Sequence, residues 1–126
     1  MLSQKEEETA SKIVDSAFTV HKKLGPGLLE SIYEVCFCHE LKKRGLKYEK
    51  QFPVTIQYDG IIFEEGLRID VLVENSIVCE LKAVTGSNSL FEAQLITYLK
   101  LTDKRLGFLI NFNVPLIKDG IKRIIL

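Results

Sequence analysis

The segment from Arg68 to Val84 constrains the fold of this chain more than any other stretch of its sequence. It contains two apolar runs separated by the polar turn Glu74-Asn75-Ser76, a pattern that predicts two strands joined by a short connection. Strands that are apolar on both faces usually lie in the middle of a sheet. An unpaired charge in such a strand carries a desolvation cost of several kcal/mol. Three charged residues nevertheless interrupt these runs, and we expect a site where they meet: Asp70, Glu80 and Lys82.

The length of the turn decides which of these charges face each other. In a three-residue loop, Asp70 lies directly opposite Glu80, with Cβ atoms about 4.5–5.5 Å apart. A two-residue loop would make the contact diagonal, still within reach of a shared ion. Lys82 leaves the same face as Glu80 because it lies two residues further along the strand. The spacing alone leaves two alternatives open, a metal site or a salt-bridged hairpin at the rim of a sheet.

The metal alternative follows from the chemistry of the three side chains. Two adjacent carboxylates repel each other unless a proton or a cation lies between them. Magnesium typically takes one or two carboxylates, with water and substrate phosphate as its other ligands. A lysine beside such a metal can orient or deprotonate a water, or stabilise negative charge on a phosphate.

The rest of the pattern predicts one α+β domain over residues 1–126, with a mixed central sheet flanked by helices. Helical spacing predicts a first helix that ends at Gly25-Pro26-Gly27, a second over 29–43 and a third over 90–101. Alternation and Asp59-Gly60 predict a hairpin after residue 48. Gly66 is expected to form a bulge or a bend before Leu67 and the central strands, which gives the order α-α-β-β-β-β-α-β-β.

Composition narrows the class of protein without naming its partner. Lys plus Arg and Asp plus Glu balance at 17 each, so no overall charge attracts nucleic acid. The three cysteines lack metal-ligand spacing and predict reduced thiols in a cytoplasmic protein. No secretory signal or membrane span is expected, and therefore no membrane partner. A local basic groove stays open as an alternative, with these candidate residues: Lys42, Lys43, Arg44, Lys47, Lys100, Lys104, Arg105, Lys122 and Arg123.

Asp70 followed by Glu80-Leu81-Lys82 resembles the signature of the PD-(D/E)xK nuclease superfamily. Ile69 stands where the name of that superfamily has proline. The segment from Gln94 to Tyr98 resembles the Gln-hydrophobic-x-x-Tyr motif of the RecB-like and Cas4-like branch. The cysteines do not reproduce the cluster ligands of Cas4-like proteins, so no iron–sulfur cluster is expected.

A second resemblance lies at the start of the second helix. The segment Gly27-Leu28-Leu29-Glu30-Ser31-Ile32-Tyr33 is similar to the pattern that gives the GxxExxY family its name. That small family of prokaryotic proteins is grouped with the PD-(D/E)xK fold, and its function is largely unassigned. Glu30 and Tyr33 are three residues apart and share a helix face.

These resemblances imply a restriction-endonuclease-like core and a role for each motif residue. Asp70 and Glu80 would bind Mg2+ or Mn2+, and Lys82 would act on the attacking water. Glu30 would be a further acidic ligand or a positioning residue, with His21 as a weaker substitute. The remaining candidates would support the site or contact the substrate: Gln94, Tyr98 and Tyr33.

Two classes of function remain open. The first is a metal-dependent nuclease that hydrolyses phosphodiester bonds in DNA or RNA with a metal-activated water assisted by Lys82. The second is a catalytically inactive module that keeps the nuclease fold and binds nucleic acid or regulates another protein. A homodimer would supply a longer groove than one 126-residue chain, but the sequence shows no specific interface.

Overall fold

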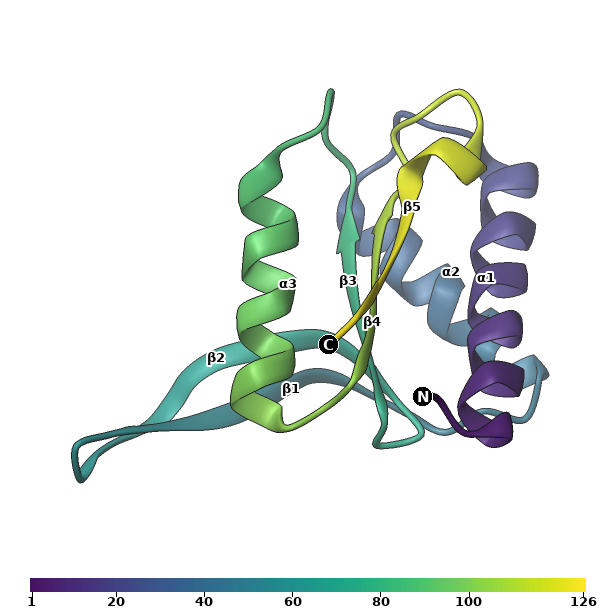
Figure 1. Cartoon of the computed structure of the whole chain (residues 1–126). Coiled ribbons are helices and arrows are strands. Elements are labelled where there is room, and N and C mark those ends of the chain that lie inside the picture. The colour runs from purple at the N-terminus through teal and green to yellow at the C-terminus, as the bar shows by residue number, and fades with distance from the viewer.

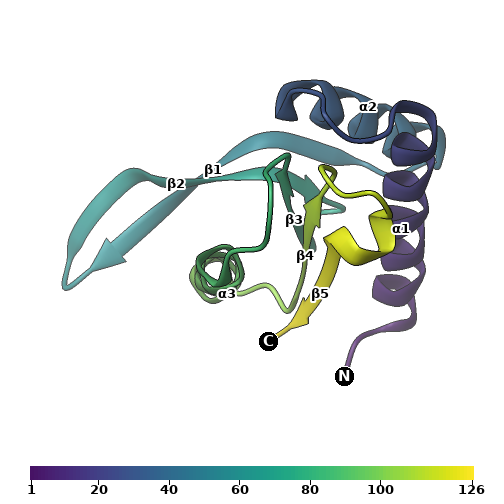
Figure 2. The same ribbon diagram turned by 90° about the horizontal axis from the view of Figure 1, so that it is seen from above.

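The structure is a computed structural model that describes residues 1–126. A five-stranded mixed sheet with strand order β1-β2-β3-β4-β5 separates two layers of helices (Figures 1 and 2). Helices α1 and α2 cover one face of the sheet, and α3 covers the other. The elements in chain order are α1 (Gln4–Leu24), α2 (Glu30–Lys43), β1 (Tyr48–Tyr58), β2 (Ile61–Val73), β3 (Ile77–Lys82), α3 (Ser89–Thr102), β4 (Leu106–Asn111), the 3-10 helix η1 (Ile117–Gly120) and β5 (Ile121–Ile125).

The predicted α+β class is confirmed, and the strand directions follow from the connections. Strands β3 and β4 are parallel and are joined by the crossover helix α3, whereas the other neighbouring strands are antiparallel. Local capping residues mark the ends of the helices. Helix α1 begins with a capping box formed by Ser3 and Glu6 and ends at Gly25, whose φ of +70° favours glycine. Asn88 caps α3, because its side-chain oxygen accepts from the N–H of Leu90 at 2.9 Å. No helix is long and apolar enough to span a lipid bilayer.

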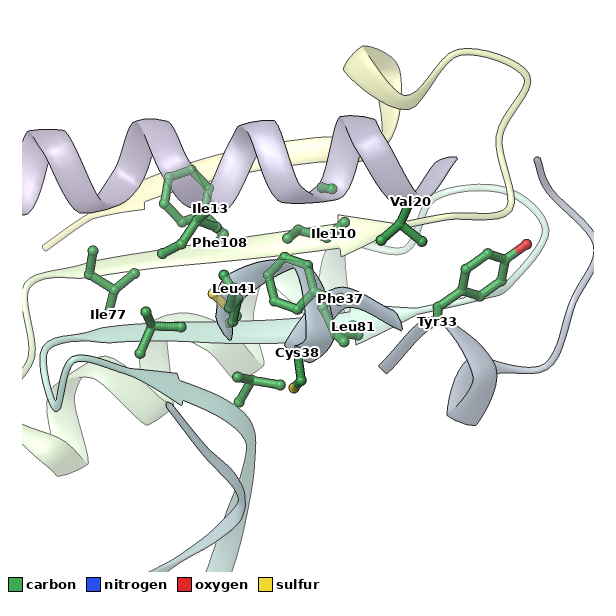
Figure 3. Close-up of a cluster of buried hydrophobic side chains, with 14 of the residues drawn as sticks. Ile13, Val20, Tyr33, Phe37, Cys38, Leu41, Ile77, Leu81, Phe108 and Ile110 are labelled. Carbon is green, nitrogen blue, oxygen red and sulfur yellow. The ribbon is translucent and has the colours of Figure 1, made fainter. Parts of the chain in front are cut away.

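The larger core lies between the sheet and the pair α1 and α2 (Figure 3). Strand β3 contributes Ile77, Cys79 and Leu81 to this core, while Val78 packs with α3 on the opposite face. Because side chains alternate along a strand, Glu80 and Lys82 leave the α3 face. The pattern of apolar residues in β3 therefore decides where its two charges lie.

The expected irregularity at Gly66 is confirmed, but the separate strand expected after it is not. Strand β2 continues from Ile61 to Val73, so the chain has one strand fewer than expected. The register shifts within it: Val54 pairs with Leu67 and Ile56 with Phe63, so one residue of β1 stands opposite residues 64–66 of β2. A Cβ atom added at Gly66 would overlap the side chain of Ile56 and lie 2.8 Å from its Cβ, so glycine is also needed here because the neighbouring strand approaches closely.

The distal part of the β1–β2 hairpin extends beyond the rest of the sheet as an arm (Figures 1 and 2). Its turn is the predicted Asp59-Gly60, with Tyr58 paired to Ile61. The apolar side chains at its tip are exposed: Tyr58, Ile61, Ile62 and Phe63. A two-stranded ribbon with this much apolar surface buries little of it within the chain.

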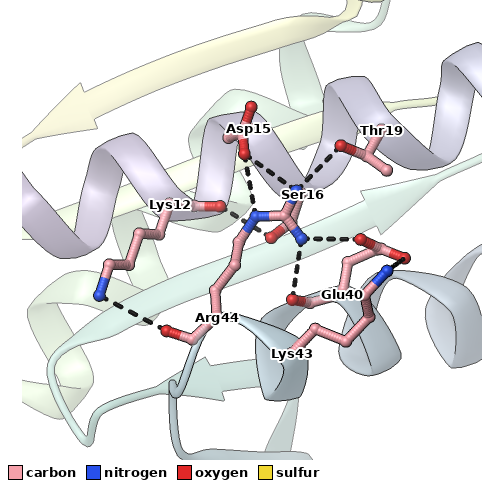
Figure 4. Close-up of polar contacts among 7 residues, drawn as sticks. All are labelled: Lys12, Asp15, Ser16, Thr19, Glu40, Lys43 and Arg44. Atoms are coloured by element: carbon pink, nitrogen blue, oxygen red, sulfur yellow. Dashed lines mark hydrogen bonds and ion pairs between the residues drawn. The ribbon is translucent and has the colours of Figure 1, made fainter.

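Arg44 connects α1 to α2 (Figure 4). Its guanidinium donates to Asp15 at 2.9 Å, to Thr19 at 2.9 Å and to the buried Glu40 at 2.7 Å. The hydrogen bond from Arg44 holds the pKa of the Glu40 carboxyl below its usual value. This network fixes the helix that begins with Glu30 against the helix before it.

Candidate functional site

The register of the central hairpin is the one expected for a three-residue loop. Val73 pairs with Ile77 across the turn, and the regular ladder continues to Val71 and Cys79. The next position brings Asp70 of β2 beside Glu80 of β3. The prediction that these two residues lie opposite each other is confirmed.

At this position the two side-chain carboxylates, and not backbone carbonyls, accept the hydrogen bonds between β2 and β3. The backbone N–H of Asp70 donates to Oε1 of Glu80 at 3.2 Å, and the N–H of Leu81 donates to Oδ2 of Asp70 at 2.9 Å. Each carboxylate therefore accepts a hydrogen bond from the opposite strand. Asp70 is half-buried and Glu80 is only 7% exposed. Two acidic groups thus occupy one small, largely desolvated space.

The electrostatics of this pair are those of two carboxyl groups that cannot both ionise freely. Burial, and after it the neighbouring Asp70 carboxylate, together raise the pKa of Glu80 to about 9. At neutral pH, and with no cation present, Glu80 therefore keeps its proton. A divalent cation between the two groups would remove this penalty because it compensates both negative charges.

Lys82 lies on the same face but turns away from the carboxylates. Its ammonium lies 4.3 Å from the centroid of the Phe91 ring, and it forms no ion pair with Asp70 or Glu80. Its positive charge nonetheless lowers the pKa of Glu80 slightly. Lys82 and Phe91 both line a cavity of about 210 Å3 between β3, the first turn of α3 and the segment that includes η1.

Asn111 fixes the chain where β3 ends. It pairs with Lys82 across the parallel strands, its side-chain oxygen accepts from the N–H of Val84, and its amide donates to the carbonyl of Val84 at 2.9 Å. Neither Asn111 nor Phe91 was expected at the site from the sequence. An amide at the end of the apolar run 106–112 was a usable signal for Asn111, whereas nothing in the pattern of α3 distinguished Phe91 from its other apolar residues.

Glu30 is exposed at the first residue of α2 and lies within electrostatic range of Asp70. Its pKa is raised, first by partial desolvation and then by the charge of Asp70, and the charge of Lys82 opposes this shift. The structure brings no three His, Cys, Asp or Glu side chains close enough together to hold one metal ion. Glu30 therefore lies near the pair without completing a three-ligand cluster.

Helix α3 brings Tyr98 to the same place. Tyr98 is half-buried, and its pKa is raised first by desolvation and then by the charges of Glu80 and Asp70. Gln94 lies one helical turn earlier, is half-buried and makes no side-chain hydrogen bond. The structure therefore places Tyr98 beside the carboxylate pair and leaves the amide of Gln94 without a partner in the chain.

Tyr33 does not lie where the sequence analysis placed it. Its side chain is fully buried and stacks on Phe112 with ring centroids 4.7 Å apart (Figure 3 shows it at the end of the core). Its hydroxyl donates to the carbonyl of Gly25 at 2.6 Å and accepts from the N–H of Leu28 at 3.1 Å. Tyr33 has no free surface for a substrate, because its position three residues after Glu30 points into the core. It instead holds the turn that precedes Glu30.

His21 and the cysteines also lie apart from the carboxylates. Nε2 of His21 is 2.8 Å from the carbonyl oxygen of Val114, which joins the end of α1 to the loop after β4. All three cysteines are free, as expected. Burial raises the pKa of the Cys38 thiol to about 12 and raises that of Cys79 as well, so both remain protonated thiols.

Comparison with known proteins identifies the family of the chain. The family model of the PD-(D/E)XK nuclease superfamily matches residues 7–124, which is nearly the whole chain. No curated protein and no solved structure matches the chain. Asp70, Glu80 and Lys82 lie within the matched range, on neighbouring strands of a mixed sheet flanked by helices. The chain belongs to the PD-(D/E)XK nuclease superfamily.

Proposed function

We propose that the protein is a metal-dependent nuclease that hydrolyses phosphodiester bonds in DNA or RNA. Membership of a nuclease superfamily supports the reaction class. The observation that carries the proposal is the reciprocal arrangement of Asp70 and Glu80, in which each carboxylate accepts an N–H from the opposite strand. That arrangement holds two acidic groups together at a cost that a divalent cation would relieve.

The donor set fits Mg2+ or Mn2+. Both residues offer carboxylate oxygens, which hard divalent cations prefer, and the half-buried Asp70 leaves access from solvent. Asp70 and Glu80 would hold the metal, and Glu30 would contribute a further ligand, directly or through a water. When bound, the metal polarises the scissile phosphate and lowers the pKa of its bound water.

The side chains around Asp70 and Glu80 would contact the substrate or the attacking water. Lys82 would orient the attacking water or neutralise the charge that develops on the phosphate. Tyr98 and Gln94 would line the substrate side of the site from α3. The unpartnered amide of Gln94 supports this role, because it has donors and an acceptor free for a nucleic-acid strand.

The proposal extends to the finer placement in the RecB-like branch and the GxxExxY family. The structure offers a physical reason for each residue of that pattern. Gly27 has a φ of +99°, Glu30 lies within electrostatic range of Asp70, and Tyr33 holds the intervening turn. A cytoplasmic location and assembly as a homodimer also belong to the proposal.

A catalytically inactive binding or regulatory module is the second candidate. The exposed apolar tip of the β1–β2 arm favours it, since such a surface is typical of a contact with another protein. Part of the expected basic surface is already neutralised within the chain. These ion pairs join Lys43 and Arg44 to Glu40, Lys122 to Glu92, and Arg123 to Glu7.

A cleavage assay distinguishes the two candidates. Labelled single- and double-stranded DNA and RNA are incubated with the protein in Mg2+ or Mn2+, and then with a chelator. We expect cleavage that the chelator stops and that Asp70→Asn and Lys82→Ala abolish, while the exposed control Glu64→Gln on the arm keeps full activity. Cleavage that survives both site substitutions would overturn the proposed site. Absence of cleavage together with absence of metal binding by calorimetry would favour the inactive module.

A further inference from the structure

Lys82 contacts an aromatic ring, although its charged neighbours favour an ion pair. It follows Glu80 by two residues on the same face, so an ion pair with Glu80 or Asp70 is the simplest expectation. Its ammonium instead lies 4.3 Å from the centroid of the Phe91 ring, and no carboxylate is within ion-pair distance. Two further acids line the same cavity, Glu92 and Asp119, and Lys82 pairs with neither. Glu92 is bound to Lys122.

The position of Phe91 is well suited to hold a cation. Phe91 is half-buried in the first turn of α3. It packs against the apolar cluster between α3 and the sheet, so its ring has limited freedom. A lysine ammonium within about 6 Å of a ring centroid is attracted by the negative face of the ring.

We propose that Phe91 is a positioning residue that holds the Lys82 ammonium away from Asp70 and Glu80, so that the two carboxylates stay open to a divalent cation. This inference rests on the metal site of the proposed function. Lys82 is then held at the wall of the cavity that it lines together with Phe91, where a substrate phosphate can approach it. Without the ring, the flexible lysine side chain can turn to the carboxylates and compete with the metal for them.

The test compares Phe91→Leu with Phe91→Tyr, which restores an aromatic face. Phe63→Leu is the matched control, since it makes the same chemical change on the exposed tip of the arm. Two readouts are independent of catalysis. The first is the proton NMR shift of the Lys82 ε-methylene, which a ring current moves upfield, and the second is Mn2+ affinity by calorimetry.

We expect Phe91→Leu to lose the upfield shift and to bind Mn2+ about fivefold more weakly, in line with the strength of a cation–π contact. Phe91→Tyr should restore both, and Phe63→Leu should change neither. Phe91→Met provides a second, unbranched replacement if the leucine variant does not fold by circular dichroism.

Several results would overturn the inference. Among them are an unshifted ε-methylene in the wild-type protein, and wild-type Mn2+ affinity in folded Phe91→Leu or Phe91→Met. Wild-type protein that binds Mn2+ but cleaves no nucleic acid would overturn the proposed nuclease, while the comparison of Mn2+ affinities would still decide the role of Phe91. Wild-type protein that binds no Mn2+ would overturn both.

Discussion

Asp70 and Glu80 bind each other's strand: the N–H of Asp70 donates to Glu80, and Asp70 accepts from the N–H of Leu81, the residue that follows Glu80. The two carboxylates therefore have a structural task, as hydrogen-bond acceptors, besides any chemical one. Charge and hydrogen bonding can be separated here, because an amide side chain keeps the acceptor oxygen and loses the charge.

The first prediction uses this separation at Asp70. Asp70→Asn should unfold at the same temperature as the wild-type protein or a higher one, because it removes a charge beside Glu80 and keeps an acceptor for Leu81. Asp70→Ala leaves that buried N–H without a partner and should lose about 1–3 kcal/mol of stability. Both variants should lose Mg2+ binding. Thermal unfolding without metal and calorimetry with metal check these outcomes, and equal destabilisation by both substitutions would contradict the role of Asp70 as a hydrogen-bond acceptor for Leu81.

The second prediction concerns the pH dependence of stability without metal. The folded state raises the pKa of Glu80 to about 9, so it binds a proton that the unfolded chain releases near pH 4.5. This contribution is fully present below that pH and is lost as the pH rises to about 9. The wild-type protein should therefore lose stability relative to Glu80→Gln by at most about 1.4 kcal/mol per pH unit across this window. Urea unfolding at several pH values measures the difference, and parallel curves would contradict the raised pKa.

The register of the site was predictable from sequence, but the position of the lysine ammonium was not. Turn length and the burial of Val71 and Val73 determine the register, because a one-residue slip would turn these side chains to the opposite face. The same alternation puts Lys82 on the α3 face. Its rotamer depends on Phe91, which comes from another element and carries no distinguishing pattern.

Two errors show what local patterns leave undetermined. Gly66 correctly indicated an irregularity, but it was also expected to separate two strands, whereas pairing with β1 keeps β2 continuous through it. Tyr33 shares a helix face with Glu30, but that face extends from the site to the core. The stacking partner that draws Tyr33 inward, Phe112, lies far along the chain. Both outcomes depend on contacts that a single segment does not contain.

The third prediction concerns the contact between α1 and α2. Arg44→Ala removes the hydrogen bond to the buried Glu40 and the links to Asp15 and Thr19, and should cost about 1–3 kcal/mol at pH 7. Arg44 lowers the pKa of Glu40, so its contribution is present above pH 4.5 and is lost as the pH falls through the folded pKa. Urea unfolding should therefore show a smaller difference at acid pH. Lys43→Ala, which removes a more exposed partner of Glu40, is the control and should cost less than about 1 kcal/mol.

The fourth prediction tests the role assigned to Gly66. Gly66→Ala should destabilise the protein by about 1–3 kcal/mol, because the added methyl group overlaps the side chain of Ile56. Shortening the opposing side chain in Ile56→Ala/Gly66→Ala removes the closest atoms but keeps the Ile56 Cβ, so it should recover part of that loss relative to Ile56→Ala alone. A double-mutant cycle by chemical denaturation measures the coupling. Additive effects would mean that Gly66 acts through its backbone conformation alone.

The fifth prediction separates a structural role of Tyr33 from a substrate role. Tyr33→Phe keeps the stack on Phe112 but leaves the carbonyl of Gly25 and the N–H of Leu28 without the hydroxyl, and should cost about 0.5–1.5 kcal/mol of stability. Because the turn carries Glu30, we expect weaker Mn2+ binding, while KM for the nucleic acid at saturating metal stays unchanged. Glu30→Gln should weaken Mn2+ binding without the loss of stability, which distinguishes the ligand from the residue that holds it. A raised KM in Tyr33→Phe at saturating metal would restore Tyr33 as a substrate-binding residue and contradict the role inferred from its burial.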